Sequence, residues 1–467
     1  MILDTFHSSG WRSPCAANVL AAVLLATSGP AAAQDGPVHT LSDLTKSADA
    51  ASFGLRAARH RIAAAEAQLG EAKVSPFFQF RIDSGLTAVP DARGVPGYDA
   101  QPPQLQRSFG PAASVGIRGT VPIWTFGKID AAQEAASHGV DAAEHGLSRT
   151  RNRLRYDIRR AYFAVQLALD LQQMIGEGKP KLDKAKKRID QAAKDGTPVE
   201  GDDDPLMGYR LTTALAELEG RTSQAKLLEA GALEALQTLT SIDAVRVPDC
   251  PLAVTVFESH DRNWYEQAAL DHRPELGMLR AAIGARQANV DAKDAGYYPD
   301  LALALRADVI YAPGRTVWDQ YDPYDVAGGL VARWKLDFWG NSLRTDRARE
   351  QLLETVAQRR LAQQGILLEV ATRREALLDA QRRIQAWESG HSAGRKWFIS
   401  AAQAYQVGTA TTKQLIDGVK EYFKARYAHL QAIHDHNVAL AALELATGAE
   451  LVPADRWERS CELPPDE

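Results

Sequence analysis

The sequence predicts a mainly α-helical protein with a small β part, in which long antiparallel coiled-coil helices carry a few strands at one end. Three observations support this fold class. The spacing of apolar residues changes from a helical period to a period of two just after Pro76, and again just after Pro299. Two long helical patterns run over about 128–194 and 341–406. The whole helix–strand order occurs twice in the chain.

The change of period is clearest within residues 273–312. Up to Gly296 the apolar residues recur at helical spacing, and the stretch is rich in Ala, Arg, Gln and Asp. Beyond Pro299, Leu301 and the alternate residues after it form an apolar face, while Asp300 and the intervening residues form a mostly polar face. We therefore expect a helix that runs directly into a two-faced strand.

The chain is predicted to contain two internal repeats, which align with Pro76 on Pro299. Residues 34–250 form the first repeat and residues 251–450 the second, with a C-terminal tail over 451–467. Each repeat is expected to consist of a helix, two strands, a very long helix, a tip turn and a final helix. The strands are expected at about 76–89, 111–124, 299–312 and 325–338.

The long helices give the molecule its expected shape. At ~1.5 Å per residue, each would span roughly 100 Å. Two of the shorter helices laid end to end would match one long helix. Heptad-like spacing with polar outer faces favours coiled-coil packing. The sequence therefore predicts a tall cylinder of antiparallel helices with the strands together at one end.

Charge and cysteine content narrow the function class. The 467 residues carry a net charge of −5 and show no basic stripe with interleaved aromatic residues, so nucleic-acid binding is not expected. After the N-terminal segment, no apolar run approaches the ~20 residues of a membrane-spanning helix. Cys250 and Cys461 could pair in an oxidising compartment, or could remain two free thiols.

The N-terminus is predicted to be a secretory signal peptide over residues 1–33. Arg12 precedes an apolar run from Cys15 to Thr27, and the small residues 31–33 suit cleavage before Gln34. The alternative is a buried N-terminal helix.

Four strands with one apolar face cannot close a barrel within one chain, and lipid does not tolerate open strand edges. Two, three or four copies would supply eight, twelve or sixteen strands, and about twelve would leave an aqueous lumen. The alternation then directs six charged residues into the lumen, where water can solvate them: Arg81, Asp83, Arg118, Arg306, Asp308 and Arg333.

Aromatic residues cluster at the ends of the predicted strands. They would form an interfacial girdle in a membrane barrel, or they would pack the strand–helix junctions. These residues are Trp124, Phe126, Trp334, Phe338 and Trp339.

The residues resemble the TolC-type outer-membrane efflux proteins over about 38–450. The stretches that carry the resemblance are "HRPELGMLRAAIGARQANVDAKDAGYYPDL", "WTFGK", "FWGNS" and "AYQVGTATTKQLIDGVKEYFKARYAHLQAIHDHNVALAALELATG". The resemblance implies a homotrimer with a twelve-stranded transmembrane barrel and a helical tunnel through the periplasm. It also implies docking to a periplasmic adaptor protein and an inner-membrane pump.

The resemblance further implies functional residues at the periplasmic tip. The turn 407–409 (Val407, Gly408, Thr409) matches the Val-Gly turn where adaptor hairpins dock, and Gly196 with Thr197 takes that place in the first half. Some members constrict the entrance with carboxylates just beyond the turn. Asp417 matches one such position, but Gln414 occupies the other.

An acidic loop follows the first tip turn. Three copies of Asp202, Asp203 and Asp204 would place nine carboxylates near the tip, as a cation-attracting ring with some raised pKa values. The alternative is a solvated loop that caps the following helix through Asp204 or Pro205.

No enzyme, metal or cofactor motif emerges from the chain. His429, His434 and His436 lack the spacing and the partner ligands of a tetrahedral metal site. No phosphate-binding glycine loop, GxSxG or HExxH is present. We therefore expect no catalytic site and no cofactor.

The functional hypothesis is a passive duct of a tripartite efflux or type I secretion system, located in the outer membrane with a long periplasmic portion. A periplasmic coiled-coil scaffold without a pore is the alternative. The apolar strand faces argue against it, because such faces are not expected on soluble hairpins. Whether the substrate is a drug, a metal or a protein stays open.

Overall fold

The computed structural model describes residues 37–77, 79–93, 104–195, 206–313, 324–454 and 456–457. For residues 89–93 and 104–108 it describes the backbone alone. Its helices are α1 (Leu41–Ala51), α2 (Phe53–Val74), α3 (Lys128–Asp195), α4 (Met207–Thr240), α5 (Arg262–His272), α6 (Pro274–Asp294), α7 (Phe338–Gln406) and α8 (Thr412–Thr447), with short 3₁₀ turns η1 (Ser75–Phe77) and η2 (Ala295–Tyr297). Its strands are β1 (Gln79–Arg93), β2 (Gln104–Trp124), β3 (Asp300–Tyr311) and β4 (Tyr324–Arg333).

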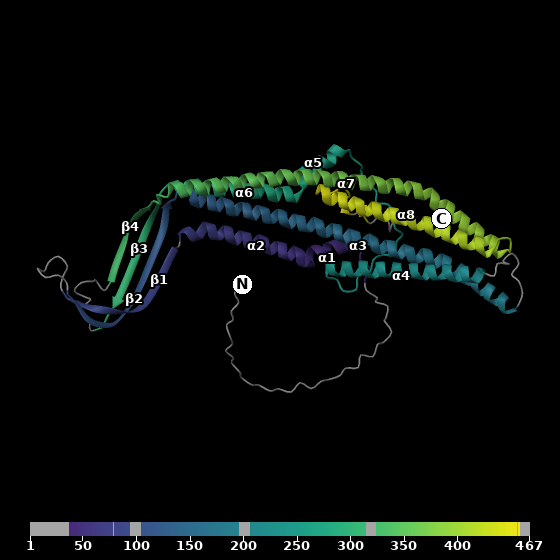
Figure 1. The fold of residues 1–467 in the computed structure, drawn as a ribbon, viewed down its shortest axis with the longest axis horizontal. Helices are drawn as coiled ribbons and strands as arrows, with labels where there is room; N and C mark the ends of the chain where they lie inside the picture. Colours follow the sequence, from purple (N-terminus) through teal and green to yellow (C-terminus); the bar gives the residue numbers. More distant parts are fainter. Residues whose placement is uncertain are drawn as a thin grey trace, which may run out of the picture.

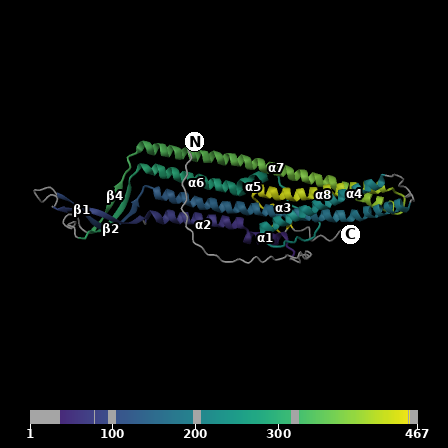
Figure 2. The same ribbon diagram turned by 60° about the horizontal axis from the view of Figure 1, so that its bottom comes forward.

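The molecule is an elongated helical body with a sheet at one end and two helical tips at the other (Figure 1). Near the sheet, α2, α3, α6 and α7 lie side by side in that order, which both ribbon views show (Figure 2). Farther from the sheet, α4 packs on α3, and α8 packs on both α3 and α7. The expected mainly helical fold with two very long helices is confirmed, since α3 has 68 residues and α7 has 69.

The shorter helices are interrupted where the sequence predicted single segments. A break at Ser52 separates α1 from α2, and Arg273 separates α5 from α6. Pro274 takes the first position of α6, where its missing N–H costs nothing and its fixed φ suits a helix start. Arg273 is held in place by the carbonyls of Leu445 and Ala446 and by Glu369.

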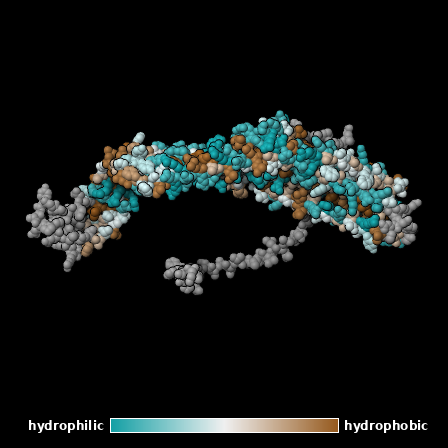
Figure 3. Space-filling model, turned by 45° about the horizontal axis from the view of Figure 1, so that its top comes forward, coloured by the Kyte–Doolittle hydropathy of each residue, from teal (hydrophilic) through white to brown (hydrophobic). Residues whose placement is uncertain are grey.

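The hydrophobic core extends from the middle of the helical body to the tips, between α1, α3, α4, α7 and α8. Its fully buried side chains include Leu44, Ile158, Phe163, Leu236 and Leu440. In contrast, the visible face of the helical body is mainly hydrophilic with separate hydrophobic patches (Figure 3). The core therefore occupies mainly the part of the helical body away from the sheet.

The linker between α4 and α5 is tied to the core by polar side chains. Leu252 N–H donates to Oδ2 of Asp170 at 2.7 Å, and Thr255 N–H donates to Oδ1 of Asn437 at 3.0 Å. Both side chains are buried. Burial raises the pKa of Asp170, although the Leu252 N–H opposes this shift.

The sheet is antiparallel with the order β1-β2-β3-β4, and within the described residues β1 and β4 each have one neighbouring strand. β1 and β2 reach beyond the predicted strands, to Arg93 and back to Gln104. β4 ends at Arg333, earlier than predicted. The reason is that Asp337 accepts a hydrogen bond from Gly340 N–H at 3.1 Å, which caps the start of α7 at Phe338.

No helix in the described part of the chain combines the length and the apolar character needed to cross a membrane.

Candidate functional site: a charged sheet face and a helical tip

One face of the sheet carries all six charged residues that the sequence directed to a lumen. The register pairs Arg81 with Arg118 and Arg118 with Arg306, so three arginines form one cross-strand row. Two residues further along the strands, Asp83 faces Gly116 and Gly116 faces Asp308. Arg333 lies on the same face but nearer the helices, opposite Asp300.

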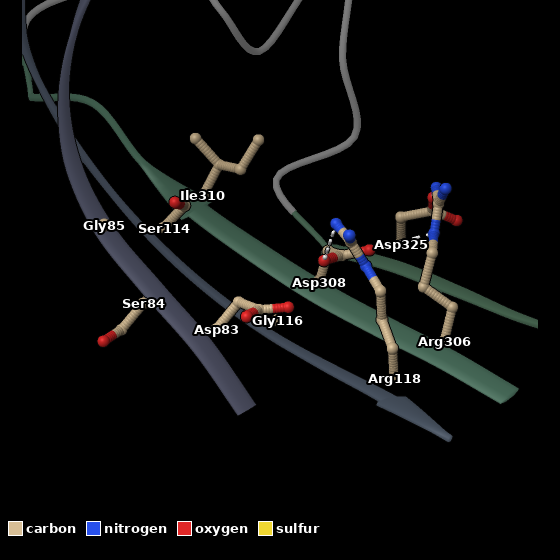
Figure 4. Close-up of a pocket in the computed structure, with 10 residues that line it drawn as sticks. All are labelled: Asp83, Ser84, Gly85, Ser114, Gly116, Arg118, Arg306, Asp308, Ile310 and Asp325. Atoms are coloured by element: carbon tan, nitrogen blue, oxygen red, sulfur yellow. Dashed lines mark hydrogen bonds and ion pairs between the residues drawn. The ribbon is translucent and has the colours of Figure 1, made fainter. Parts of the chain in front are cut away.

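Five of these charged side chains contact one another within or across the strands, and Figure 4 shows several of them. Arg118 Nη2 lies 3.4 Å from Oδ1 of Asp308, and Arg306 Nε lies 2.9 Å from Oδ2 of the same residue. Arg81 pairs with Asp83 at 3.0 Å on its own strand. Asp83, Arg118, Arg306 and Asp308 border a hollow of about 660 Å³ on this face.

Asp325 belongs to the same group, although it is not among the six residues predicted from the strand alternation. It faces Asp308 in the register and forms an ion pair with Arg306. The sequence contains the information to find it, because Asp325 and Arg333 lie an even number of residues apart on one predicted strand. Both side chains therefore point to the same face of the sheet.

The opposite face of the sheet is apolar and exposed. Its large side chains remain mostly accessible in the single chain, with Leu86 88%, Val326 82% and Leu330 79% exposed. A soluble protein rarely leaves such a face uncovered, whereas lipid would cover it.

The aromatic residues at the strand ends both pack the junctions and remain accessible. Phe126 stacks on Tyr298 with ring centroids 5.0 Å apart, and Trp334 donates a hydrogen bond to the Tyr297 carbonyl. Trp124 is nevertheless 58% exposed and Trp339 is 81% exposed. The girdle and junction interpretations are therefore compatible in this structure.

The tip between α7 and α8 is a tight turn built on glycine. Gly408 has a φ of +80°, which favours glycine, and Thr409 N–H donates to the Ala404 carbonyl at 2.9 Å. Val407, Gly408 and Thr409 are all exposed, Val407 by 75%. The turn therefore presents its side chains to solvent rather than to the core.

Gln414 and Asp417 lie one turn apart on the exposed side of α8. Gln414 forms a reciprocal cap with Thr411: its N–H donates to Thr411 Oγ1 at 3.3 Å, and its Oε1 accepts from Thr411 N–H at 2.9 Å. This capping box starts the helix, so Gln414 has a structural role that a carboxylate at the same position could also fill.

Several predicted site residues fall outside the described residues. They are the signal peptide 1–33, Gly196, Thr197, Asp202, Asp203, Asp204 and Cys461. Cys250 takes part in a disulfide, so it is not a free thiol, while its pairing with Cys461 stays a prediction.

The three histidines of α8 lie in three different environments. His429 stacks on His391 of α7, and His436 is buried beside Asn437. His434 contacts Asp435; burial alone would raise the pKa of Asp435, but hydrogen bonds from His434, Arg383 and Gln431 lower it to about 2. No group of three potential metal ligands occurs among the described residues.

Comparison with known proteins adds to this geometry. The sequence model of the family described as "Outer membrane efflux protein" matches residues 44–198 and 265–449, well over half of the chain. Among curated protein sequences, none matches significantly.

Solved structures share the fold at low sequence identity. CusC superposes with a TM-score of 0.72 at 17% identity, covering 88% of this chain and 92% of CusC. VceC from Vibrio cholerae gives 0.70 at 18% identity, covering 88% and 97%. The MtrE outer membrane channel of Neisseria gonorrhoeae gives 0.70 at 18%, covering 88% and 89%.

The match over both halves, the two-faced sheet and the long helical body agree with one another. The chain belongs to the outer membrane efflux protein family and is an outer-membrane efflux channel whose helical part lies in the periplasm.

Proposed function

We propose that three copies of the chain close one passive conduit, with a twelve-stranded barrel in the outer membrane and a helical tunnel below it. The observation that carries this proposal is the four-stranded sheet, which is charged on one face, apolar on the other and open at β1 and β4. Lipid does not tolerate open edges, so neighbouring copies must pair with both of them. Three copies give an aqueous lumen with the charged face inward.

The edge helix α7 supports assembly at the level of the tunnel. Leu343, Leu353, Leu361 and Leu368 are each 58–70% exposed along this helix. Burying a leucine side chain contributes roughly 1.5–3 kcal/mol. We assign these leucines to the contact between α7 of one copy and the neighbouring copy.

Members of this family act with a periplasmic adaptor and an inner-membrane pump. The proposed docking turn is Val407–Gly408–Thr409, with Gly196 and Thr197 in the matching turn of the first half. Gln414, Asp417 and the loop of Asp202, Asp203 and Asp204 are proposed to border the entrance. The pump supplies the energy, and the conduit needs no catalytic residue.

Assembly is tested by the mass of the detergent-extracted mature protein, measured by light scattering, and by its migration with and without boiling. We expect three chains per particle, and a monomer would contradict the proposal. A Leu361→Asn, Leu368→Asn variant should dissociate more easily. Its matched control replaces the exposed polar residues Gln364 and Thr372 of the same helix by Asn and should stay trimeric.

Docking is tested by a photoreactive amino acid in place of Val407, activated in intact cells. We expect a cross-linked adduct that mass spectrometry identifies as a periplasmic adaptor. The control carries the same group at Trp264, which is also partly exposed but lies on α5, far along the chain from the tip. Equal adaptor capture at both positions would contradict docking at this turn.

A further inference from the structure

The charged face of the sheet is organised in two rows of opposite sign. The arginine row consists of Arg81, Arg118 and Arg306, which the register places side by side on β1, β2 and β3. The aspartate row consists of Asp83, Asp308 and Asp325 on β1, β3 and β4. Each row has three charges per chain, so the two rows cancel.

The rows lie close together along the strands. They are two residues apart, which corresponds to roughly 6.7 Å of strand. β1 leaves the helical body at Gln79, so the arginine row lies on the helix side and the aspartate row lies farther out.

Contacts between the rows involve residues of all four strands, and they cross from β2 to β3 and from β3 to β4. Arg81 contacts Asp83, Arg118 contacts Asp308, and Arg306 contacts both Asp308 and Asp325. Asp308 therefore bridges two arginines, and its side chain is the least exposed of the six at 22%. Figure 4 shows Arg118 and Arg306 reaching from adjacent strands toward these carboxylates.

Glycine makes the central contact possible. Gly116 occupies the aspartate row on β2, and a Cβ at this position would lie 2.1 Å from Oδ1 of Asp308. The missing side chain lets the Asp308 carboxylate lie over β2, within reach of Arg118. The gap in the aspartate row is thus filled by the neighbouring strand's carboxylate.

We propose that the two rows form a paired double ring that sets the ion selectivity of the barrel. This inference rests on the proposed trimeric conduit, in which nine arginines and nine aspartates would form the two rings. Rings of charged side chains select ions by sign. Here each ring is neutralised by its neighbour, so the barrel passes cations and anions alike, and removing either ring exposes the selectivity of the other.

The test uses the purified mature trimer in planar lipid bilayers, with potassium chloride gradients and the reversal potential as readout. Variant A is Asp83→Asn, Asp308→Asn, Asp325→Asn, and variant B is Arg81→Gln, Arg118→Gln, Arg306→Gln. Variant A should shift the permeability ratio toward chloride and variant B toward potassium, each by about threefold or more. The variant with all six substitutions should return to the wild-type ratio.

Ionic strength gives a second readout. The Debye length falls from ~10 Å at 0.1 M salt to ~3 Å at 1 M, so both shifts should shrink in concentrated salt. Arg262→Gln is the matched control: it removes an exposed charge from α5, which projects from the helical body, and should leave the permeability ratio unchanged.

The outcomes separate the two proposals. The double ring is wrong if wild-type trimers conduct but variants A and B keep the wild-type permeability ratio. It is also wrong if both variants shift this ratio in the same direction. A wild-type protein without trimers or conductance would overturn the conduit itself. If a triple variant no longer gives a heat-modifiable trimer, the single substitutions Asp308→Asn and Arg118→Gln must still shift the ratio in opposite directions.

Discussion

The Tyr422 hydroxyl of α8 donates a 3.1 Å hydrogen bond to Oε2 of Glu177 in α3. Arg426 Nη1 donates to the same carboxylate oxygen at 2.8 Å and lies 2.6 Å from the Tyr422 hydroxyl oxygen. One carboxylate thus joins the helix pair α3–α4 to the pair α7–α8 on the tip side of the core. Any opening of the tips that separates these pairs must break both hydrogen bonds.

Replacing Glu177 by Ala should loosen this connection. The half-buried Arg426 guanidinium would lose its charged acceptor, and hydrogen bonds to charged groups contribute about 1.5–3 kcal/mol. We expect a lower thermal midpoint and faster proteolysis near the tips. Glu219→Ala is the control, since Glu219 pairs with Lys179 in full contact with solvent, and it should change neither readout. Equal effects of the two substitutions would contradict the connecting role of Glu177.

Arg159 of α3 and Glu444 of α8 form an ion pair that is almost wholly buried, with side chains 9% and 13% exposed. The Arg159 guanidinium also lies over the Trp457 ring, 4.2 Å from its centroid. Arg159→Met should lower the unfolding free energy by about 3–5 kcal/mol, because it leaves a buried carboxylate without its cation. Denaturant titration followed by tryptophan fluorescence measures this change.

The double variant Arg159→Met, Glu444→Met tests the reason for that loss. Replacing both partners by apolar residues removes the unpaired charge, so most of the stability should return. A double variant as unstable as Arg159→Met alone would show that packing against Trp457, rather than the lone carboxylate, causes the loss.

Much of the fold could be predicted because it depends on local pattern. The change of period at Pro299 located the start of β3, and the alternation after it determined which face is charged. The end of β4 was placed too late because Trp334 and Phe338 continue an apolar pattern. The capping carboxylate of Asp337 ends that pattern, and only the backbone geometry shows that it caps α7.

The candidate sites could be predicted only where the alternation of residues along a strand determines the face on which a side chain lies. Alternation identified six charged residues on one face and would also have identified Asp325. It could not show that Gly116 makes room for Asp308, since that depends on the register between β2 and β3. Glu177 and Tyr422 are 245 residues apart, so their contact follows from the packing of α3 on α8 and from no sequence period.

The predicted disulfide between Cys250 and Cys461 can be tested by peptide mapping. If Cys250 pairs with Cys461, a non-reducing digest of the mature protein should yield one peptide pair joined by a disulfide, which disappears on reduction. Cys461→Ser should then leave Cys250 reactive toward a maleimide. It should also lower the thermal midpoint, because a native disulfide restrains the unfolded chain and typically contributes about 2–4 kcal/mol. An unreactive Cys250 in that variant would rule out the pairing.

Two histidines that link α7 to α8 should make the stability of the protein depend on pH. The rings of His391 and His429 stack with centroids 5.3 Å apart and an interplanar angle of 10°. Burial lowers the pKa of both below the usual 6.5. The charges of His429, Arg426 and Arg395 lower the pKa of His391 further, whereas the charge of Glu177 raises it. The charge of Glu388 raises the pKa of His429.

Because these pKa values are lower in the folded protein than in the unfolded chain, the pair has no effect on stability well above pH 6.5. As the pH falls through 6.5, the unfolded chain binds protons that the folded pair does not, and the free energy of unfolding decreases. The double variant His391→Gln, His429→Gln should therefore lose less thermal stability between pH 7 and pH 5 than the wild type. His60→Gln, at an exposed site on α2, serves as the control. If all three proteins lose the same stability over this range, the stacked pair does not contribute to the acid sensitivity of the protein.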